Sequence, residues 1–219
     1  HNSKGLDYDT NEILCSNGSK QAIYQTLLYL CDSNSEVIIP TPYWSSYPKM
    51  VELVGAKSVF LKTSIDNSYD IDVGELEKLI TSKTRVLILC NPNNPTGIIY
   101  NLSTLQQIAN IVQKYKIYVI SDEVYEMIDY YKGHISFAKL DNMKKYTFTI
   151  NGFSKGFGMT GYRLGYVAAP KEHIKNLTSL QSQITSCSSY ISQKCGIDAL
   201  NDYTYYQTCI EELKSVAEY

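Results

Sequence analysis

Two cations lie close together in the segment NGFSKGFGMTGYRLGY, residues 151–166: Lys155 and, eight positions later, Arg163. A lysine amine can attack a carbonyl and form a Schiff base, and a guanidinium offers fixed, paired donors to a phosphate. Arginine is scarce in this chain and occurs elsewhere only at Arg85. Most lysines are simply solvated, however, so this segment alone does not decide between chemistry and plain surface.

A second candidate is the segment NGSKQA, in which Gly18, Ser19 and Lys20 follow an apolar run and enter a helical pattern. The free N–H groups and the dipole of a helix start suit an anion such as phosphate. An ordinary capped helix start explains the same residues, and without context it is the commoner case. The chain's one tryptophan, Trp44, follows the next apolar run; a lone tryptophan is usually core, but at a strand end it could stack on a flat ring.

Two further segments place polar groups after apolar runs. In NPNNPTG the prolines and the glycine fix a loop that could orient the amide of Asn94, or could be only a rigid turn. In DEVYE, Asp122 and Tyr125 lie three apart and share one side of a turn. An exposed carboxylate at a helix start is the alternative explanation for Asp122.

Seven short β-branched or apolar runs alternate with helical patterns, and the sequence therefore predicts an α/β fold: a three-layer sandwich with a mostly parallel, seven-stranded sheet covered by helices. The runs are EILCS, EVIIP, SVFL, RVLILC, IYVIS, YTFTI and LGYVAA. The connection over residues 151–163 is too short and glycine-rich for a crossover helix, so the last two strands could be antiparallel. Ligands of such sheets gather beyond the carboxyl ends of the strands, where the candidate residues lie.

Helix start signals support this interpretation, because Asp72 precedes Glu75, and Ser103 precedes Gln106, by the three positions of a capping box. We expect one domain over residues 1–219, with 171–219 a long helical segment. The net charge of −2 gives no basic field for nucleic acid, and no apolar run approaches the roughly 18 residues of a membrane span. The three histidines are scattered, so we expect no metal site, and six cysteines without CxxC spacing fit a cytoplasmic protein.

Taken together, SNGSKQA, TPYWSSYPKM, NPNNPTG, SDEVYE and SKGFGMTGYRLGY resemble the pyridoxal-phosphate (PLP) aminotransferases of fold type I, class I/II, and are most similar to the bacterial-type aspartate aminotransferases. The five motifs occur in family order and span nearly the whole chain. The resemblance implies the large domain of that fold, PLP as the cofactor, and amino-acid and 2-oxo-acid substrates. It also implies a homodimer, and transfer of an amino group, with aspartate or glutamate as the expected donor, through an aldimine on Lys155.

The resemblance also implies a role for each residue. Lys155 carries the cofactor and moves a proton, Asp122 pairs with the ring nitrogen, and Tyr125 and Asn94 bind the phenolic oxygen. Trp44 stacks on the ring. The phosphate falls to Gly18, Ser19, Lys20 and Arg163, with Ser154 as a further candidate, because Gly152 stands where many relatives have a phosphate-binding serine. In this subgroup the lysine at position 20 is also associated with the distal carboxylate of acidic substrates.

Two alternatives share most of these residues: a PLP-dependent carbon–sulfur lyase of the same fold, from which Lys20 would distinguish an aminotransferase, and a non-catalytic PLP-sensing regulator domain, which would need a DNA-binding region outside this chain. The resemblance places an N-terminal arm before residue 1, and after residue 219 a small domain with the arginine for the substrate α-carboxylate. We therefore expect residues 1–219 alone to lack transaminase activity.

Overall fold

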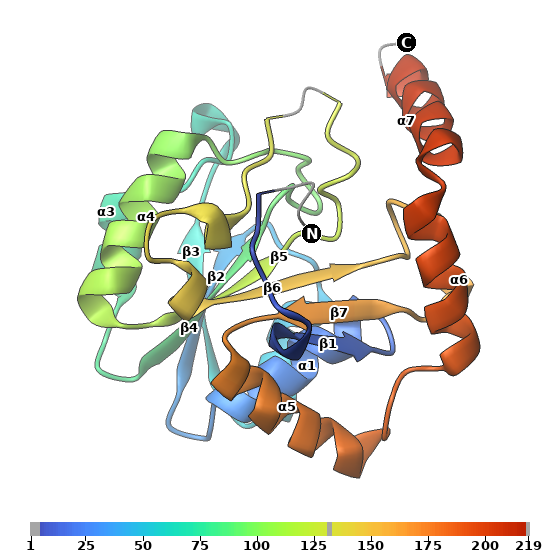
Figure 1. Cartoon of the computed structure of the whole chain (residues 1–219). Helices are drawn as coiled ribbons and strands as arrows, with labels where there is room; N and C mark the ends of the chain where they lie inside the picture. The colour runs from blue at the N-terminus through green and yellow to red at the C-terminus, as the bar shows by residue number, and fades with distance from the viewer. Residues whose placement is uncertain (1–4, 131–132, 218–219) are drawn as a thin grey trace.

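The computed structural model describes residues 5–130 and 133–217, and these form a sheet with helices on both faces (Figure 1). The sheet has seven strands in the order β1-β7-β6-β5-β4-β2-β3. Their bounds are β1 Ile13–Ser16, β2 Glu36–Thr41, β3 Lys57–Lys62, β4 Thr84–Cys90, β5 Tyr118–Asp122, β6 Thr147–Gly152 and β7 Gly165–Ala168. All seven predicted strands are therefore confirmed.

Strand β7 is the one that runs against its neighbours. It pairs antiparallel with both β6 and β1, whereas the pairs from β6 through β5, β4 and β2 to β3 are parallel. The short connection from β6 to β7 holds no crossover helix, and this is why the chain must turn back at that point. The predicted fold class, including the reversed last strand, is confirmed.

The two faces of the sheet bury alternate residues of each strand. In β2, Val37 and Ile39 belong to one apolar cluster and Ile38 to the other. Such continuous apolar strands are typical of parallel sheets that are covered on both sides. Helices α1 and α5 pack in the first cluster with α2, and helices α3 and α4 in the second. The helices are α1 Ser19–Leu30, α2 Ser46–Leu53, α3 Val73–Leu79, α4 Leu102–Tyr115, α5 Lys171–Ile184, α6 Tyr190–Asn201 and α7 Tyr203–Ala217.

One of the two predicted helix starts is confirmed and the other is wrong. Asp72 caps α3 and accepts a hydrogen bond from the Glu75 N–H at 3.0 Å. The N-cap of helix α4, in contrast, lies two residues before the expected cap at Ser103: it is Asn101, which accepts a hydrogen bond from the Thr104 N–H at 2.9 Å. Asparagine is as good a cap as serine, and Asn101 also donates to an Asp70 carboxylate oxygen at 3.0 Å, which fixes it there.

The expected long helical segment over residues 171–219 is three helices in the described part, α5, α6 and α7, with breaks at 185–189 and at Asp202. Helix α5 packs under the sheet beside α1, whereas α6 and α7 stand at the edge of the molecule and α7 projects beyond the sheet (Figure 1). The Tyr206 hydroxyl donates to the Met127 carbonyl, which ties α7 to the loop after β5. Among the described residues, no helix combines the length and the apolar character needed to cross a membrane.

Candidate active site

The carboxyl ends of the parallel strands open onto a cavity of about 290 Å³. It is lined by residues from the starts of α1 and α2, from the ends of β4 and β5, from the loops after β2, β4 and β5, and from the β6–β7 connection. The lining residues are Ser19, Lys20, Trp44, Tyr47, Cys90, Asn94, Asp122, Val124, Tyr125, Ser154, Lys155, Thr160 and Arg163. Every candidate site residue from the sequence lies in this lining except Gly18, which lies directly behind Arg163.

The start of α1 and the guanidinium of Arg163 form one end of the cavity. A side chain at Gly18 would place its Cβ 2.5 Å from Arg163 Nη2, so a glycine lets the arginine lie over the helix start. Gly18 also has a φ of 82°, which glycine adopts at little cost. Arg163 Nη1 donates to the Thr160 carbonyl at 2.9 Å and is held in place by this bond. Helix N–H groups and a guanidinium together suit a phosphate.

The end of the sheet touches the start of α1 so closely that no side chain fits between them. A Cβ on Gly165 would lie 2.5 Å from the Ser19 nitrogen, and a Cβ on Gly152 would lie 2.4 Å from Ser19 Oγ. A serine at position 152, where the resemblance leads one to expect a phosphate-binding hydroxyl, would therefore meet Ser19 Oγ, and the Ser19 side chain would have to rotate to make room. Ser154 does line the cavity, and its carbonyl accepts a bond from the Thr160 hydroxyl at 3.0 Å.

Asp122, the last residue of β5, is buried and also lines the cavity. Its carboxylate accepts hydrogen bonds from the Tyr47 hydroxyl at 2.6 Å and from the Val124 N–H at 3.3 Å. Burial raises the pKa of Asp122, and these two donors partly oppose the shift. Across the described ranges, no lysine or arginine forms an ion pair with it. The ionised carboxylate therefore has room for a buried positive partner.

Lys155, Tyr125 and Asn94 also line the cavity and lie near one another. Lys155 Nζ lies 5.7 Å from the centroid of the Tyr125 ring, and Asn94 Nδ2 lies 3.5 Å from the Tyr125 hydroxyl. Burial raises the pKa of Tyr125, and the charges of Cys90 and Asp122 add to the shift. The phenol therefore stays neutral near pH 7 and can donate a hydrogen bond into the cavity.

Lys20 and Trp44 form a side wall of the cavity. Lys20 Nζ lies 4.8 Å from the centroid of the indole ring, a cation–π contact. The indole meets the Tyr47 ring edge-on, with the centroids 5.4 Å apart. Trp44 thus presents a flat apolar surface beside an ammonium group, as a site for a ring compound with a charged substituent would need.

Comparison with known proteins identifies the family. The sequence profile of "Aminotransferase class I and II" matches residues 1–218. The chain belongs to this family. The fold and the cavity agree with this assignment, because the motifs of the chain lie at the strand ends that line the cavity with Lys155.

Several named relatives support the assignment. The chain is 50% identical over 198 residues to a bifunctional aspartate aminotransferase and glutamate/aspartate-prephenate aminotransferase of Petunia hybrida, covering 90% of the chain and 41% of that protein. It is 38% identical to an aspartate aminotransferase of Geobacillus stearothermophilus, over 98% of the chain and 54% of that protein. The solved aspartate aminotransferase of Rhizobium meliloti superposes with a TM-score of 0.94 at 33% identity, over 98% of the chain and 55% of that structure. The chain spans about half the length of these relatives.

Sequence reasoning missed four residues of this aminotransferase cavity: Tyr47, Cys90, Val124 and Thr160. For Tyr47 a signal was present, because it lies within the motif TPYWSSYPKM, three positions after Trp44, and a buried tyrosine usually finds a partner for its hydroxyl. Val124 and Thr160 also lie within motifs, SDEVYE and SKGFGMTGYRLGY, but their side chains suggested no chemistry. Cys90 looks like an ordinary apolar residue at the end of β4.

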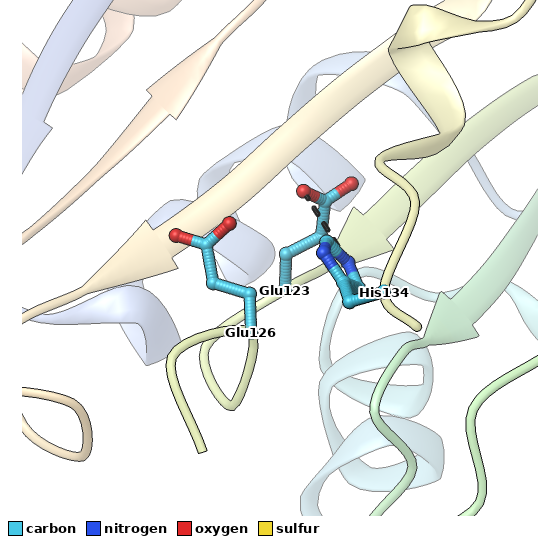
Figure 2. Close-up of side chains that lie close together, drawn as sticks. All are labelled: Glu123, Glu126 and His134. Carbon is cyan, nitrogen blue, oxygen red and sulfur yellow. Dashed lines mark ion pairs between the residues drawn. The ribbon is translucent and has the colours of Figure 1, made fainter. Parts of the chain in front are cut away.

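Beside the aminotransferase cavity, the residue after Asp122 belongs to a different cluster: the side chains of Glu123, Glu126 and His134 converge, with ligand-type atoms within 4.8 Å of one another (Figure 2). Glu123 Oε1 accepts hydrogen bonds from the Ser121 and Ser136 hydroxyls at 2.7 and 2.8 Å, and its Oε2 lies 3.8 Å from His134 Nε2. The sequence had suggested scattered histidines and no metal site, and it gave no sign that His134 meets Glu123. These contacts tie the loop after β5 back to the end of that strand.

Proposed function

We propose that the protein that carries this chain is a PLP-dependent aminotransferase that moves an amino group from an acidic amino acid to a 2-oxo acid. The observation that carries the proposal is the common cavity of Lys155, Asp122 and Arg163. A reactive amine, a buried carboxylate without a cationic side chain, and a guanidinium over a helix start face one space. Family membership supports the same conclusion.

The residues present fit PLP at three points. Its phosphate suits the start of α1 under Arg163, where Gly18 leaves no side chain in the way. A protonated ring nitrogen suits Asp122, whose burial favours a positive partner. The carbonyl carbon suits Lys155, whose amine belongs to the same cavity lining.

When bound, PLP withdraws electrons from the α-carbon of the amino acid. The chain's own groups carry out the rest. Lys155 Nζ holds the cofactor until the substrate amine replaces it, and then moves the proton that leaves the α-carbon. Asp122 keeps a proton on the ring nitrogen. Tyr125 and Asn94 donate to the phenolic oxygen, while Trp44 covers the ring and excludes water.

Lys20 supports the choice of an acidic substrate. Its ammonium reaches into the cavity over Trp44, and across the described residues it forms no ion pair with a carboxylate of the chain. A substrate with a second carboxylate would supply that partner, whereas a neutral substrate would not. The Petunia relative is named for aspartate and glutamate. We also propose a homodimer, on the family resemblance; light scattering on the complete protein tests it.

Borohydride labelling tests the proposal directly. The complete protein is loaded with PLP, reduced to make the bond to lysine permanent, and digested for peptide mapping. We expect the label on Lys155 in the unsubstituted protein and in Lys114→Ala, a control lysine that pairs with Glu77 far from the cavity. Lys155→Ala should lose transamination and keep weak cofactor binding. A label on Lys20, or on no lysine, would refute the assignment.

A substrate comparison separates the rival chemistry. The complete protein is given aspartate with a 2-oxo acid in one assay and cystathionine in another. We expect transfer from aspartate and no release of a thiol from cystathionine. Cleavage of cystathionine without transamination would make the protein a carbon–sulfur lyase, and cofactor binding without either reaction would indicate a sensor domain.

A further inference from the structure

We infer that Tyr47 is the positioning residue of the active site, and that its hydroxyl holds the Asp122 carboxylate ionised and aimed into the cavity. The role of Tyr47 in catalysis rests on the proposed function, whereas its hydrogen bond to Asp122 does not depend on any ligand. Tyr47 lies within the motif TPYWSSYPKM but was not among the candidate site residues from the sequence.

The geometry of Tyr47 leaves it little freedom. It lies at the start of α2, is 2% exposed, and its N–H donates to the Trp44 carbonyl at 3.0 Å. Its ring packs edge-on against the indole of Trp44, and its hydroxyl donates to Asp122 Oδ2 at 2.6 Å. The same loop therefore places the aromatic wall of the cavity and the donor to Asp122.

Each oxygen of the Asp122 carboxylate receives one hydrogen bond. Oδ1 accepts from the Val124 N–H and Oδ2 from Tyr47, which is the one side-chain donor to this carboxylate in the part of the chain that the structure describes. With both oxygens held, the carboxylate cannot rotate away from the cavity. Without Tyr47, only the longer bond of 3.3 Å from Val124 would remain.

A neutral donor suits this position better than a cation would. A lysine in place of Tyr47 would neutralise Asp122 and remove the negative charge that a ring nitrogen needs. The pKa of the Tyr47 hydroxyl is raised well above its usual value by burial and by the Asp122 charge, so the hydroxyl stays protonated at neutral pH. Tyr47 therefore stabilises the carboxylate and leaves its charge free for the ligand.

The first test uses the cofactor-free complete protein, so it does not depend on PLP binding or activity. The infrared band of the protonated Asp122 carboxyl is followed against pH, as the difference from Asp122→Asn. Because Tyr47→Phe removes a bond to the charged form, the protonated band should persist to higher pH than in the unsubstituted protein. Tyr118→Phe, which deletes a hydroxyl at the opposite end of β5, should leave the band unchanged. An unmoved band in Tyr47→Phe overturns the inference.

The second test uses the loaded protein. Tyr47→Phe should lower kcat about tenfold or more, as expected for the loss of one charge-assisted hydrogen bond, with a smaller change in KM. The acid limb of the kcat profile should move to higher pH, and the 15N resonance of labelled cofactor should shift toward that of an unprotonated ring nitrogen. A packing defect alone would move neither. Unchanged kcat and an unchanged acid limb would show that Asp122 does not need Tyr47.

A third measurement needs no substitution at Tyr47, should Tyr47→Phe fail to fold. In protein labelled on tyrosine, the hydroxyl proton of Tyr47 should resonate far downfield and move upfield in Asp122→Asn, whose amide oxygen is a weaker acceptor. A resonance that ignores the Asp122 substitution overturns the inference. If the protein instead binds no PLP, the proposed function fails, while the infrared and proton results still decide whether Tyr47 holds Asp122.

Discussion

Asp122 and Glu123 are adjacent, buried carboxylic acids at the end of β5, but their carboxyl groups have different surroundings. Burial raises the pKa of both, that of Glu123 to about 8. Glu123 is enclosed by the chain's own groups: two serine hydroxyls bind one oxygen, and His134 lies beside the other (Figure 2). Among the described residues, Asp122 has one side-chain donor, Tyr47, and a cavity lies in front of it.

The difference shows that a buried acid with a raised pKa does not by itself mark a ligand site. What distinguishes Asp122 is that it faces a cavity lined by other polar groups, whereas Glu123 faces groups from residues 121–136, and its Oε2 has no hydrogen bond among the described residues. A perturbed group is a functional candidate when it also faces a cavity lined by other reactive groups. The two acids should therefore respond oppositely to substitution, one in turnover and the other in stability.

The largest expected effect is on turnover in Asp122→Asn. Asparagine keeps the shape and the Tyr47 contact but loses the charge that holds the ring nitrogen protonated. We expect kcat to fall by about a few hundred-fold, where each tenfold corresponds to about 1.4 kcal/mol, and cofactor affinity to fall much less. Steady-state kinetics and a cofactor titration measure the two. In Glu123→Gln, kcat should change by less than about threefold; near-normal turnover in Asp122→Asn would end the distinction between the two acids.

A smaller effect is expected for Lys20→Ala. If the ammonium beside Trp44 binds a distal carboxylate, kcat/KM for aspartate should fall by about tenfold or more, because a charged substrate group loses its partner. Alanine as the amino donor provides the control within the same variant, and its loss should be smaller. Equal losses for the two substrates would assign Lys20 to the phosphate alone.

The pattern of the fold was readable in the sequence because apolar strands and capped helices are local signals. Seven runs of residues gave the seven strands, and Asp72 gave the start of α3. The error at α4 was also local: Asn101 and Ser103 are both good caps, and only the contact between Asn101 and Asp70 favours the first. The breaks that divide residues 171–217 into three helices left no sign in the sequence that we interpreted.

The candidate site was readable to the extent that its residues lie in motifs. Nine of the thirteen lining residues were candidates from the sequence, but the sequence did not show how they are held. The bond from Tyr47 to Asp122 joins positions 75 apart, and the contact of His134 with Glu123 crosses a loop. Such contacts depend on how the strands and loops meet in space, which no local spacing encodes. Gly152 is a further case, because only the structure shows that a side chain there would meet Ser19 Oγ.

The third prediction concerns the pH dependence of stability in Glu123→Gln. The pKa of Glu123 is raised from 4.5 to about 8, with burial as the main cause and the Glu126 charge second. The folded state then binds more protons than the unfolded state between these values, so this contribution to stability is fully present below pH 4.5 and is lost as the pH rises through about 8. Glutamine does not titrate, so the variant should lose less stability between pH 5 and 9.

Chemical unfolding of the unsubstituted protein and of Glu123→Gln across that range measures the effect, and Asp122→Asn, whose acid lies in the cavity, gives a third curve for comparison. A Glu123→Gln curve parallel to that of the unsubstituted protein would show that Glu123 does not titrate in this window. It would also remove the evidence that the chain keeps this acid protonated.

The smallest expected effect is in Ser136→Ala, which deletes one of the two hydroxyls that bind Glu123 Oε1. One buried hydrogen bond contributes about 1 kcal/mol, so the free energy of unfolding should fall by about that amount. Because the Ser136 bond lowers the pKa of Glu123, its loss raises that pKa further, and the destabilisation should be larger at pH 9 than at pH 6.

Ser182→Ala, at an exposed serine of α5, is the control and should change stability little at either pH. Turnover should be unaffected, because Ser136 is buried and does not line the cavity. A loss of turnover in Ser136→Ala without a loss of stability would mean that Glu123, too, serves the cavity, and the contrast between the two acids would have to be abandoned.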